Sequence, residues 1–396
     1  MNRLRVKLFS PHVPGSAVPR FGVRAARAFV DHCDRTPGRE VTVTGGVLDA
    51  AGAWLRWPVA RFTPVTAEQL KSDPNAVQAY AALVADGAPA FDVLFLPHPW
   101  RSFPAGRLAP NPAPIVAYVS DLDFDDADFG SVTDACRQTA GLIARDCAKV
   151  VFASEGLRRR MCERYGVPLD RTAVVRPAAT LAEPPANADA LVKELGLPTD
   201  FVVCFEAAGR SAEEDLAGLL RGDGLPWPVV VLGGEADIVR RLTAGPSDFD
   251  PIAAGRLIRL PMLSEEAYKA VLGRARAVVS LTSSPAPFFD AQHLDAMALR
   301  KPLFCEAGPG DGAWEGGDAG LAAVFRSIDE LGDGLRRIHA GEIDRGRLEA
   351  AERHARGRTE EDVVRELFAV FEAARETPPG RRIRFRAGDV ACRERR

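Results

Sequence analysis

Short apolar runs alternate with amphipathic stretches along the whole chain. Residues at helical spacing in the first half predict helices at Gly22–Asp34, Asn75–Asp86, Ser131–Cys147 and Ser154–Tyr165. Between them lie apolar runs that predict buried strands at Leu4–Phe9, Glu40–Thr44, Asp92–Leu96, Pro114–Val119, Lys149–Ala153 and Thr172–Arg176. Such alternation is typical of α/β architecture with parallel sheets.

A second series of the same kind follows Ala178–Asp189, which is rich in Ala, Pro and Glu and predicts a linker. Its predicted strands are Phe201–Phe205, Val229–Leu232, Leu257–Pro261, Ala277–Leu281, Pro302–Cys305 and Ala322–Phe325. Its predicted helices are Glu213–Leu220, Asp237–Leu242, Ser264–Ala275 and Asp295–Leu299. Two successive doubly wound units predict a two-lobed enzyme with a cleft between the lobes.

The end of the chain no longer alternates between predicted strands and helices. Residues Arg347 to Ala374 are helical in composition, and the segment from 381 onward carries seven Arg against Asp389 and Glu394. We therefore predict an N-terminal Rossmann-like domain over 1–180 and a second one over 190–345. A C-terminal helix over 346–378, crossing back to the first domain, and a basic tail over 379–396 would follow.

Composition narrows the class of protein. A chain of 396 residues has room for two domains, and its formal net charge of -3 argues against binding nucleic acid. The first residues lack the apolar core of a signal peptide, and no apolar run approaches the length of a membrane span. Seven Cys without a Cys-x-x-Cys pair, and six scattered His, predict neither a zinc site nor disulfides. We expect a cytoplasmic protein that requires no metal.

The most informative motif runs from Ser280 to Pro302. Within it, Ser284, Phe289, Asp295 and Ala296-Met297-Ala298 resemble the nucleotide-sugar motif of retaining family 4 glycosyltransferases (glycosyl transferases group 1). In that motif a first Glu stands where this chain has Pro287, and a second Glu where it has the shorter Asp295. The resemblance implies a GT-B fold, in which two Rossmann-like domains face a central cleft.

The resemblance also assigns roles in the C-terminal, nucleotide-sugar-binding domain. It implies that Asp295 accepts hydrogen bonds from the ribose hydroxyls, and that amides near Phe289 and Asp290 face the diphosphate ahead of a helix. One interpretation of Asp290 is that it substitutes for the acid missing at position 287. Against this, Asp290 stands where relatives have Gly, and its charge would oppose a phosphate. A plain helix-capping acid is the other interpretation of Asp295.

Cations and backbone groups complete the implied donor site. Arg210 would stabilise the departing diphosphate, although Glu213 and Glu214 replace the Lys that accompanies it in relatives. The backbone at Pro261 and Met262 would contact the nucleobase. The alternative for Arg210 is an ordinary surface position.

The N-terminal domain would lie on the acceptor side. Ser120 replaces a His that contacts the donor sugar in relatives, and Asp121 matches the acid that follows it. Gly15 and Ser16 lie in the loop that approaches the phosphates or the acceptor. A turn at the end of a strand is the alternative for Ser120 and Asp121.

Taken together, the resemblance implies a hexosyltransferase-like enzyme of polysaccharide biosynthesis. It would move a sugar from a nucleotide sugar to a glycan, a lipid-linked or another acceptor, retaining anomeric configuration and using no cofactor. One alternative is a catalytically degenerate GT-B protein that binds or scaffolds, and another is a nucleotide-sugar epimerase or other GT-B hydrolase. The Arg-rich tail is either solvated or in peripheral contact with anionic lipid at the inner face of the membrane.

Overall fold

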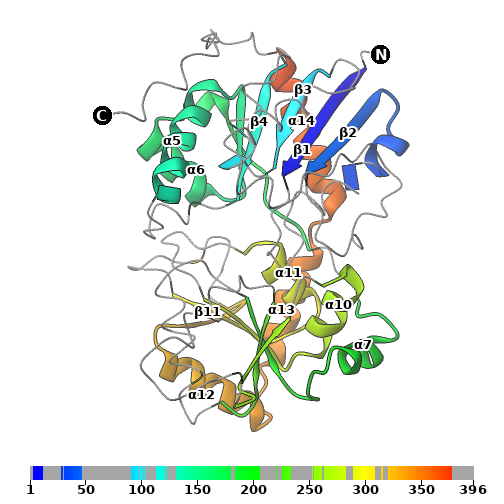
Figure 1. The fold of residues 1–396 in the computed structure, drawn as a ribbon, viewed down its shortest axis with the longest axis vertical. Helices are drawn as coiled ribbons and strands as arrows, with labels where there is room; N and C mark the ends of the chain where they lie inside the picture. Colours follow the sequence, from blue (N-terminus) through cyan, green and yellow to red (C-terminus); the bar gives the residue numbers. More distant parts are fainter. Residues whose placement is uncertain are drawn as a thin grey trace.

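A computed structural model gives the three-dimensional structure of the chain. The residues that it describes are 3–11, 28–29, 31–46, 91–97, 99–100, 103, 113–120, 122, 131–179, 183–205, 220, 225–232, 252, 254–260, 263–281, 289–307, 314 and 320–376. They form two lobes, one above the other in Figure 1.

The N-terminal lobe is built on a six-stranded parallel sheet with the order β2-β1-β3-β4-β5-β6. Its strands are β1 (Leu4–Pro11), β2 (Arg39–Gly46), β3 (Val93–Leu96), β4 (Ile115–Val119), β5 (Lys149–Phe152) and β6 (Thr172–Val174). Every residue of β3 and β4 is buried, as expected for inner strands of a sheet covered on both faces. The helices α5 (Ser131–Asp146) and α6 (Glu155–Tyr165) pack beside this sheet (Figure 1).

The C-terminal lobe contains a second six-stranded parallel sheet, with the order β12-β11-β10-β7-β8-β9. Its strands are β7 (Val202–Phe205), β8 (Val229–Leu232), β9 (Leu257–Leu260), β10 (Ala277–Ser280), β11 (Leu303–Glu306) and β12 (Ala323–Phe325). The chain leaves β7 in one direction toward β9 and then returns to build β10 on its other side. The strand order therefore reverses between β7 and β10, and open α/β sheets bind ligands at the carboxyl ends of the strands at such a switch point.

Helices of the C-terminal lobe surround this sheet. They are α7 (Ala188–Glu194), α10 (Glu265–Arg274), α11 (Ala291–Ala298), α12 (Ile328–His339) and α13 (Arg345–Arg356). Of these, α7 begins inside the segment predicted as a linker, and α11 begins four residues before the predicted helix at Asp295. The predicted helices Asn75–Asp86, Glu213–Leu220 and Asp237–Leu242 fall outside the described residues, apart from Leu220.

The helical pattern from Arg347 to Ala374 is two helices rather than one. α13 ends at Arg356, the chain turns at Gly357, and α14 (Glu360–Glu376) begins after Thr359. α13 packs against α11 in the C-terminal lobe, whereas α14 packs against β3 and β4 in the N-terminal lobe (Figure 1).

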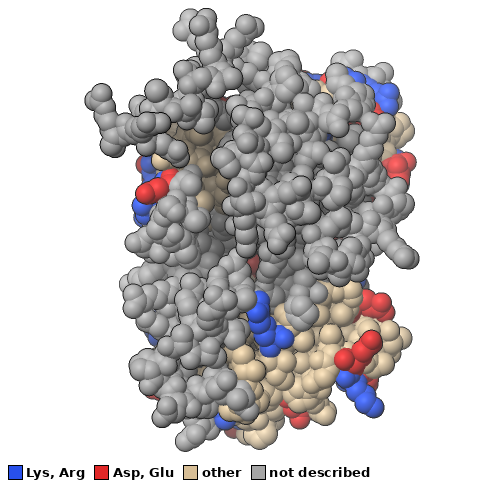
Figure 2. Space-filling view, in the orientation of Figure 1, with Lys and Arg blue, Asp and Glu red and all other residues tan. Residues whose placement is uncertain are grey.

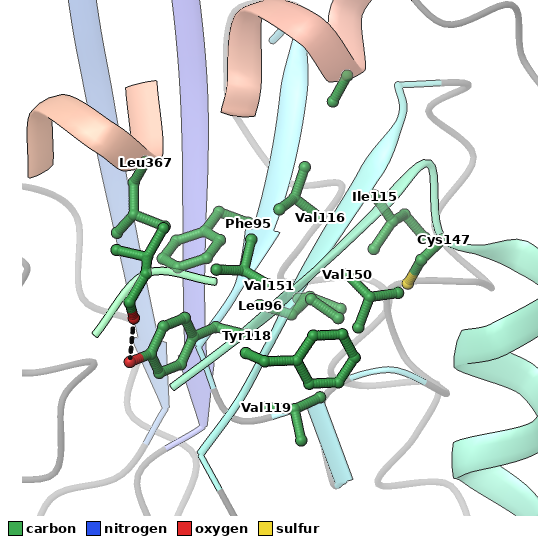
Figure 3. Packing of buried hydrophobic residues seen from close by; sticks show 14 of the residues in the cluster. Phe95, Leu96, Ile115, Val116, Tyr118, Val119, Cys147, Val150, Val151 and Leu367 are labelled. Atoms are coloured by element: carbon green, nitrogen blue, oxygen red, sulfur yellow. Dashed lines mark hydrogen bonds between the residues drawn. The ribbon is translucent and has the colours of Figure 1, made fainter. Parts of the chain in front are cut away.

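Aromatic side chains seat α14 on the N-terminal sheet. The ring of Phe371 lies 5.9 Å from that of Phe29 and 5.0 Å from that of Phe95, and all three side chains are fully buried. Leu367 reaches from the same helix toward this core (Figure 3). Glu372 forms an ion pair with Arg39, the first residue of β2. The last described helix is thus an integral layer of the first lobe.

The surface carries charges of both signs. On the face shown in Figure 2, described Lys and Arg side chains lie close to described Asp and Glu side chains in both lobes. In the described parts of the chain, no helix is both long and apolar enough to cross a membrane. The basic tail from 379 lies outside the described residues.

Candidate functional site

The described residues include four of the predicted site residues: Ser120, Phe289, Asp290 and Asp295. Ser120 follows β4 at its carboxyl end and is half-buried. The other three lie at or near the start of α11, beyond the carboxyl end of β10. The remaining predicted residues lie outside the described part of the chain: Gly15, Ser16, Asp121, Arg210, Pro261, Met262 and Ser284.

Asp290 is the N-cap of α11. Its carboxylate oxygen Oδ1 accepts hydrogen bonds from the backbone N–H groups of Gln292 at 2.8 Å and His293 at 3.1 Å. These are among the N–H groups that a helix leaves without an internal partner at its start. The carboxylate therefore occupies the positive end of this helix.

His293 lies directly behind Asp290. Its Nδ1 is 2.7 Å from Asp290 Oδ1, and its Nε2 is 2.7 Å from Ser280 Oγ. The Asp290 backbone N–H also points at Nδ1, at the longer distance of 3.2 Å. Because an ionised carboxylate can only accept, we assign the proton to Nδ1, which then donates to Asp290. Nε2 shares the other hydrogen bond with the Ser280 hydroxyl, which can either donate or accept.

The three residues form one hydrogen-bonded chain from the sheet to the helix, called here the Ser280–His293–Asp290 network. Ser280 is the last residue of β10 and pairs in register with Phe205, the last residue of β7. The network is therefore located at the point where the strand order reverses. Its inner members are buried, since the His293 side chain is 8% exposed, whereas the Asp290 side chain is 44% exposed.

The environment of Asp290 favours its ionised form. Desolvation alone would raise the pKa of Asp290, but the charge of His293 and hydrogen bonds from His293 and Gln292 outweigh it. The pKa of Asp290 consequently lies below its ordinary value. A negative charge is thus maintained at this end of the C-terminal sheet.

The charge of Asp290 acts on a residue of the N-terminal lobe. Burial raises the pKa of Tyr118, the charge of Arg358 opposes this rise, and the negative charge of Asp290 adds to it. Tyr118 belongs to β4, and its hydroxyl donates to the carbonyl oxygen of Val175 at 3.1 Å (Figure 3). The carboxyl ends of β4 and β10 therefore belong to the same region between the lobes.

Asp295 lies deeper in α11 and has no exposed surface. The hydroxyl of the fully buried Tyr268, in α10, donates to its Oδ2 at 3.4 Å. A buried carboxylate needs such partners, because removing its hydration without replacement costs several kilocalories per mole. In the structure Asp295 therefore makes a polar contact inside the lobe. Its contact with ribose stays a prediction.

Phe289 supports the start of α11 from the side. Its ring stacks on Trp314 at 5.2 Å, and Trp314 in turn lies 5.2 Å from the His293 ring. The indole Nε1 of Trp314 donates to the carbonyl oxygen of Glu306 at the end of β11. Phe289 and Trp314 therefore pack against the His293 ring and contribute no charged atom.

Ser280, His293 and Tyr268 were not among the predicted site residues. The spacing Asp290-x-x-His293 matches the capping box, in which the third residue of a helix reaches back to the cap. The usual residue at that position is Glu or Gln, so His293 gives a weak signal in sequence. Within the described residues, no group of three or more His, Cys, Asp or Glu is arranged to hold a metal ion.

Comparison with known proteins identifies the fold. No protein-family model matches the chain, and no curated protein matches it by sequence. Among solved structures, Anabaena Alr3699/HepE in complex with UDP-glucose has a TM-score of 0.64 and 16% identity, covering 93% of this chain and 100% of that one. A glycosyltransferase from Rickettsia africae has a TM-score of 0.60 and 12% identity, covering 96% and 100%.

A third neighbour carries a different activity in its name. UDP-N-acetylglucosamine 2-epimerase from Rickettsia bellii has a TM-score of 0.59 and 12% identity, covering 94% of this chain and 97% of that one. Likeness at this level of identity concerns the fold alone. The two parallel six-stranded sheets and these neighbours confirm the predicted architecture: the chain has the GT-B fold.

Proposed function

We propose that this protein is a glycosyltransferase that moves a sugar from a nucleotide sugar to a glycan, a lipid-linked or another acceptor. Polar side chains at the switch point of the C-terminal sheet carry this proposal, because they lie where a doubly wound sheet binds nucleotides. Neighbours of the same fold include a complex with UDP-glucose, which supports a nucleotide sugar as the donor class.

Within the proposal, Asp295 holds the ribose hydroxyls and Arg210 stabilises the leaving diphosphate together with amides at Phe289 and Asp290. Ser120 contacts the donor sugar from the opposite lobe, and Asp121 accompanies it. Transfer proceeds without a metal ion and with retention of the anomeric configuration. No side-chain base is required, because a departing phosphate oxygen can itself accept the proton of the acceptor. The protein acts in the cytoplasm.

Calorimetric titration with a panel of UDP-, GDP-, ADP-, dTDP- and CMP-sugars tests the donor. We expect binding to at least one member, weakened about tenfold by Asp295→Asn, which keeps the shape of the side chain and removes its charge. Asp329→Asn, at an exposed position of α12, is the matched control and should bind like the wild type. Absence of binding to every member at millimolar concentration would overturn the proposal.

A second candidate is a GT-B protein that binds without catalysing. The observation in its favour is that Asp290 already occupies the amides of α11 that a donor phosphate would need. The two functions differ in turnover: a transferase releases nucleotide when donor and acceptor are both present, whereas a binding protein retains the donor intact.

The proposal includes contact with a membrane, because a lipid-linked acceptor would lie there. Arg381, Arg382, Arg384 and Arg386 would attract anionic lipid at about 1 kcal/mol for each charge near the surface. Sedimentation with phosphatidylserine vesicles should therefore be lost when these four residues are replaced by Ala. Equal sedimentation of both proteins would remove the tail from the proposal.

A further inference from the structure

The negative charge of Asp290 lies where the proposed function requires the donor's phosphates. We propose that Asp290 is a specificity-determining residue that competes with the diphosphate of a nucleotide sugar and lowers its affinity. This inference rests on the proposed function and concerns the same site. It follows from three properties of Asp290: its hydrogen bonds, its anchoring and its exposure.

The hydrogen bonds of Asp290 engage the groups that would bind an anion. A phosphate at the start of α11 would need the backbone N–H groups of Gln292 and His293. Both already donate to one oxygen of Asp290, at 2.8 and 3.1 Å. A diphosphate can reach them only after the carboxylate has moved away.

The Ser280–His293–Asp290 network holds the carboxylate in place. His293 donates to Asp290 and is itself fixed by Ser280, which belongs to the central strand β10. Because His293 and Ser280 are buried, the imidazole cannot follow Asp290 into solvent. Displacement of Asp290 by a ligand would therefore break a charge-assisted hydrogen bond.

Exposure gives the carboxylate its effect on ligands. The Asp290 side chain is 44% exposed, so its charge acts on molecules that approach the switch point. A diphosphate carries like charge, so the carboxylate repels it at contact distance. A donor with fewer phosphate charges is repelled less.

Asp290→Asn isolates this effect, because Asn and Asp are equally good N-caps. The amide oxygen can accept the same backbone hydrogen bonds, and only the charge is lost. We expect calorimetry to show that UDP binds Asp290→Asn about tenfold more tightly than the wild type, with a larger gain at low salt. Uridine, which has no phosphate, should bind both proteins equally.

Asp344→Asn is the matched control variant. Asp344 is also the Asp N-cap of a helix, accepting from the backbone N–H of Arg347 at 3.0 Å. It lies ten residues before His354, whose ring is 6.4 Å from Phe289, which places it about 15 Å along α13 from the site. UDP should bind this variant as it binds the wild type.

Two results would overturn the inference, and they are distinguishable. If UDP binds the wild type and Asp290→Asn with the same affinity, Asp290 does not compete with the diphosphate, and the proposed function stands. If neither protein binds UDP, uridine or any nucleotide sugar of the panel, the proposed function fails and the inference with it.

Discussion

Each lobe has a junction in which a buried parallel strand is followed by a helix, and the two junctions are capped differently. In the N-terminal lobe, β5 leads almost directly into α6, whose N-cap is the buried Ser154. In the C-terminal lobe, β10 leads through a longer connection to α11, whose N-cap is the half-exposed Asp290. One cap is a neutral hydroxyl, and the other is an ionised carboxylate linked to a buried His.

The difference follows the strand order of the two sheets. β5 lies between β4 and β6, its neighbours in sequence, so the order does not reverse there and no ligand crevice is expected. β10 lies beside β7 at the reversal. The cap beside β5 is a neutral hydroxyl, whereas the cap at the reversal is charged and belongs to a hydrogen-bonded network.

The largest effect should come from the apolar face of α6. Met161 is fully buried in the core of the N-terminal lobe, and Met161→Ala should lower the free energy of unfolding by about 2–5 kcal/mol. Urea denaturation measures this loss. A loss below about 1 kcal/mol would mean that α6 is not held by packing, and the contrast with α11 would disappear.

A smaller effect is expected from the buried polar contact of α11. Asp295→Ala should cost about 1–3 kcal/mol, because it leaves the buried hydroxyl of Tyr268 without this acceptor. A double-mutant cycle with Tyr268→Phe measures the coupling of the pair. Strictly additive losses would show that the 3.4 Å contact contributes nothing to stability.

Loss of the neutral cap should cost less again. Ser154→Ala removes the acceptor of the Leu157 backbone N–H, at 3.1 Å, and should lower the free energy of unfolding by about 1 kcal/mol. Asp290→Asn keeps its cap and should change stability at neutral pH by only a few tenths of a kcal/mol. If Asp290→Asn proved the more damaging of the two, the charge of Asp290 would stabilise the fold by more than a neutral N-cap does.

The smallest effect is expected in the stability of the protein at acid pH. The pKa of Asp290 is lowered in the folded protein from an ordinary value of 3.8, so its ionised form stabilises the fold above that pH. This contribution is lost as the pH falls through the lowered pKa. Asp290→Asn should therefore flatten the acid limb of stability against pH, whereas Ser154→Ala, which removes no titrating group, should leave its shape unchanged.

The sequence predicted the strands well because inner parallel strands are continuous apolar runs. All four residues of β7 and of β10 are buried, and both strands fall inside the predicted segments. The junction of α13 and α14 could not be predicted from composition, since helix formers continue on both sides of Gly357. Which lobe each of these helices joins is decided by packing between residues far apart in the chain.

The candidate site was predictable only in part. Asp295 and Phe289 were found through the order of a known motif, and they lie on either side of the start of α11. The role of His293 depends on its distances to Asp290 and Ser280, which join residues 3 and 13 positions apart. A single His in an apolar stretch does not reveal such partners.

The position of α14 has a consequence for folding during synthesis on the ribosome. The strands of the first lobe end at Val174, but the helix that covers Phe29 and Phe95 begins only at Glu360. At about 5–20 residues per second, those strands wait roughly 10–40 s for their last layer to be synthesised. The core of the first lobe can therefore be completed only after the strands of the second lobe have been synthesised.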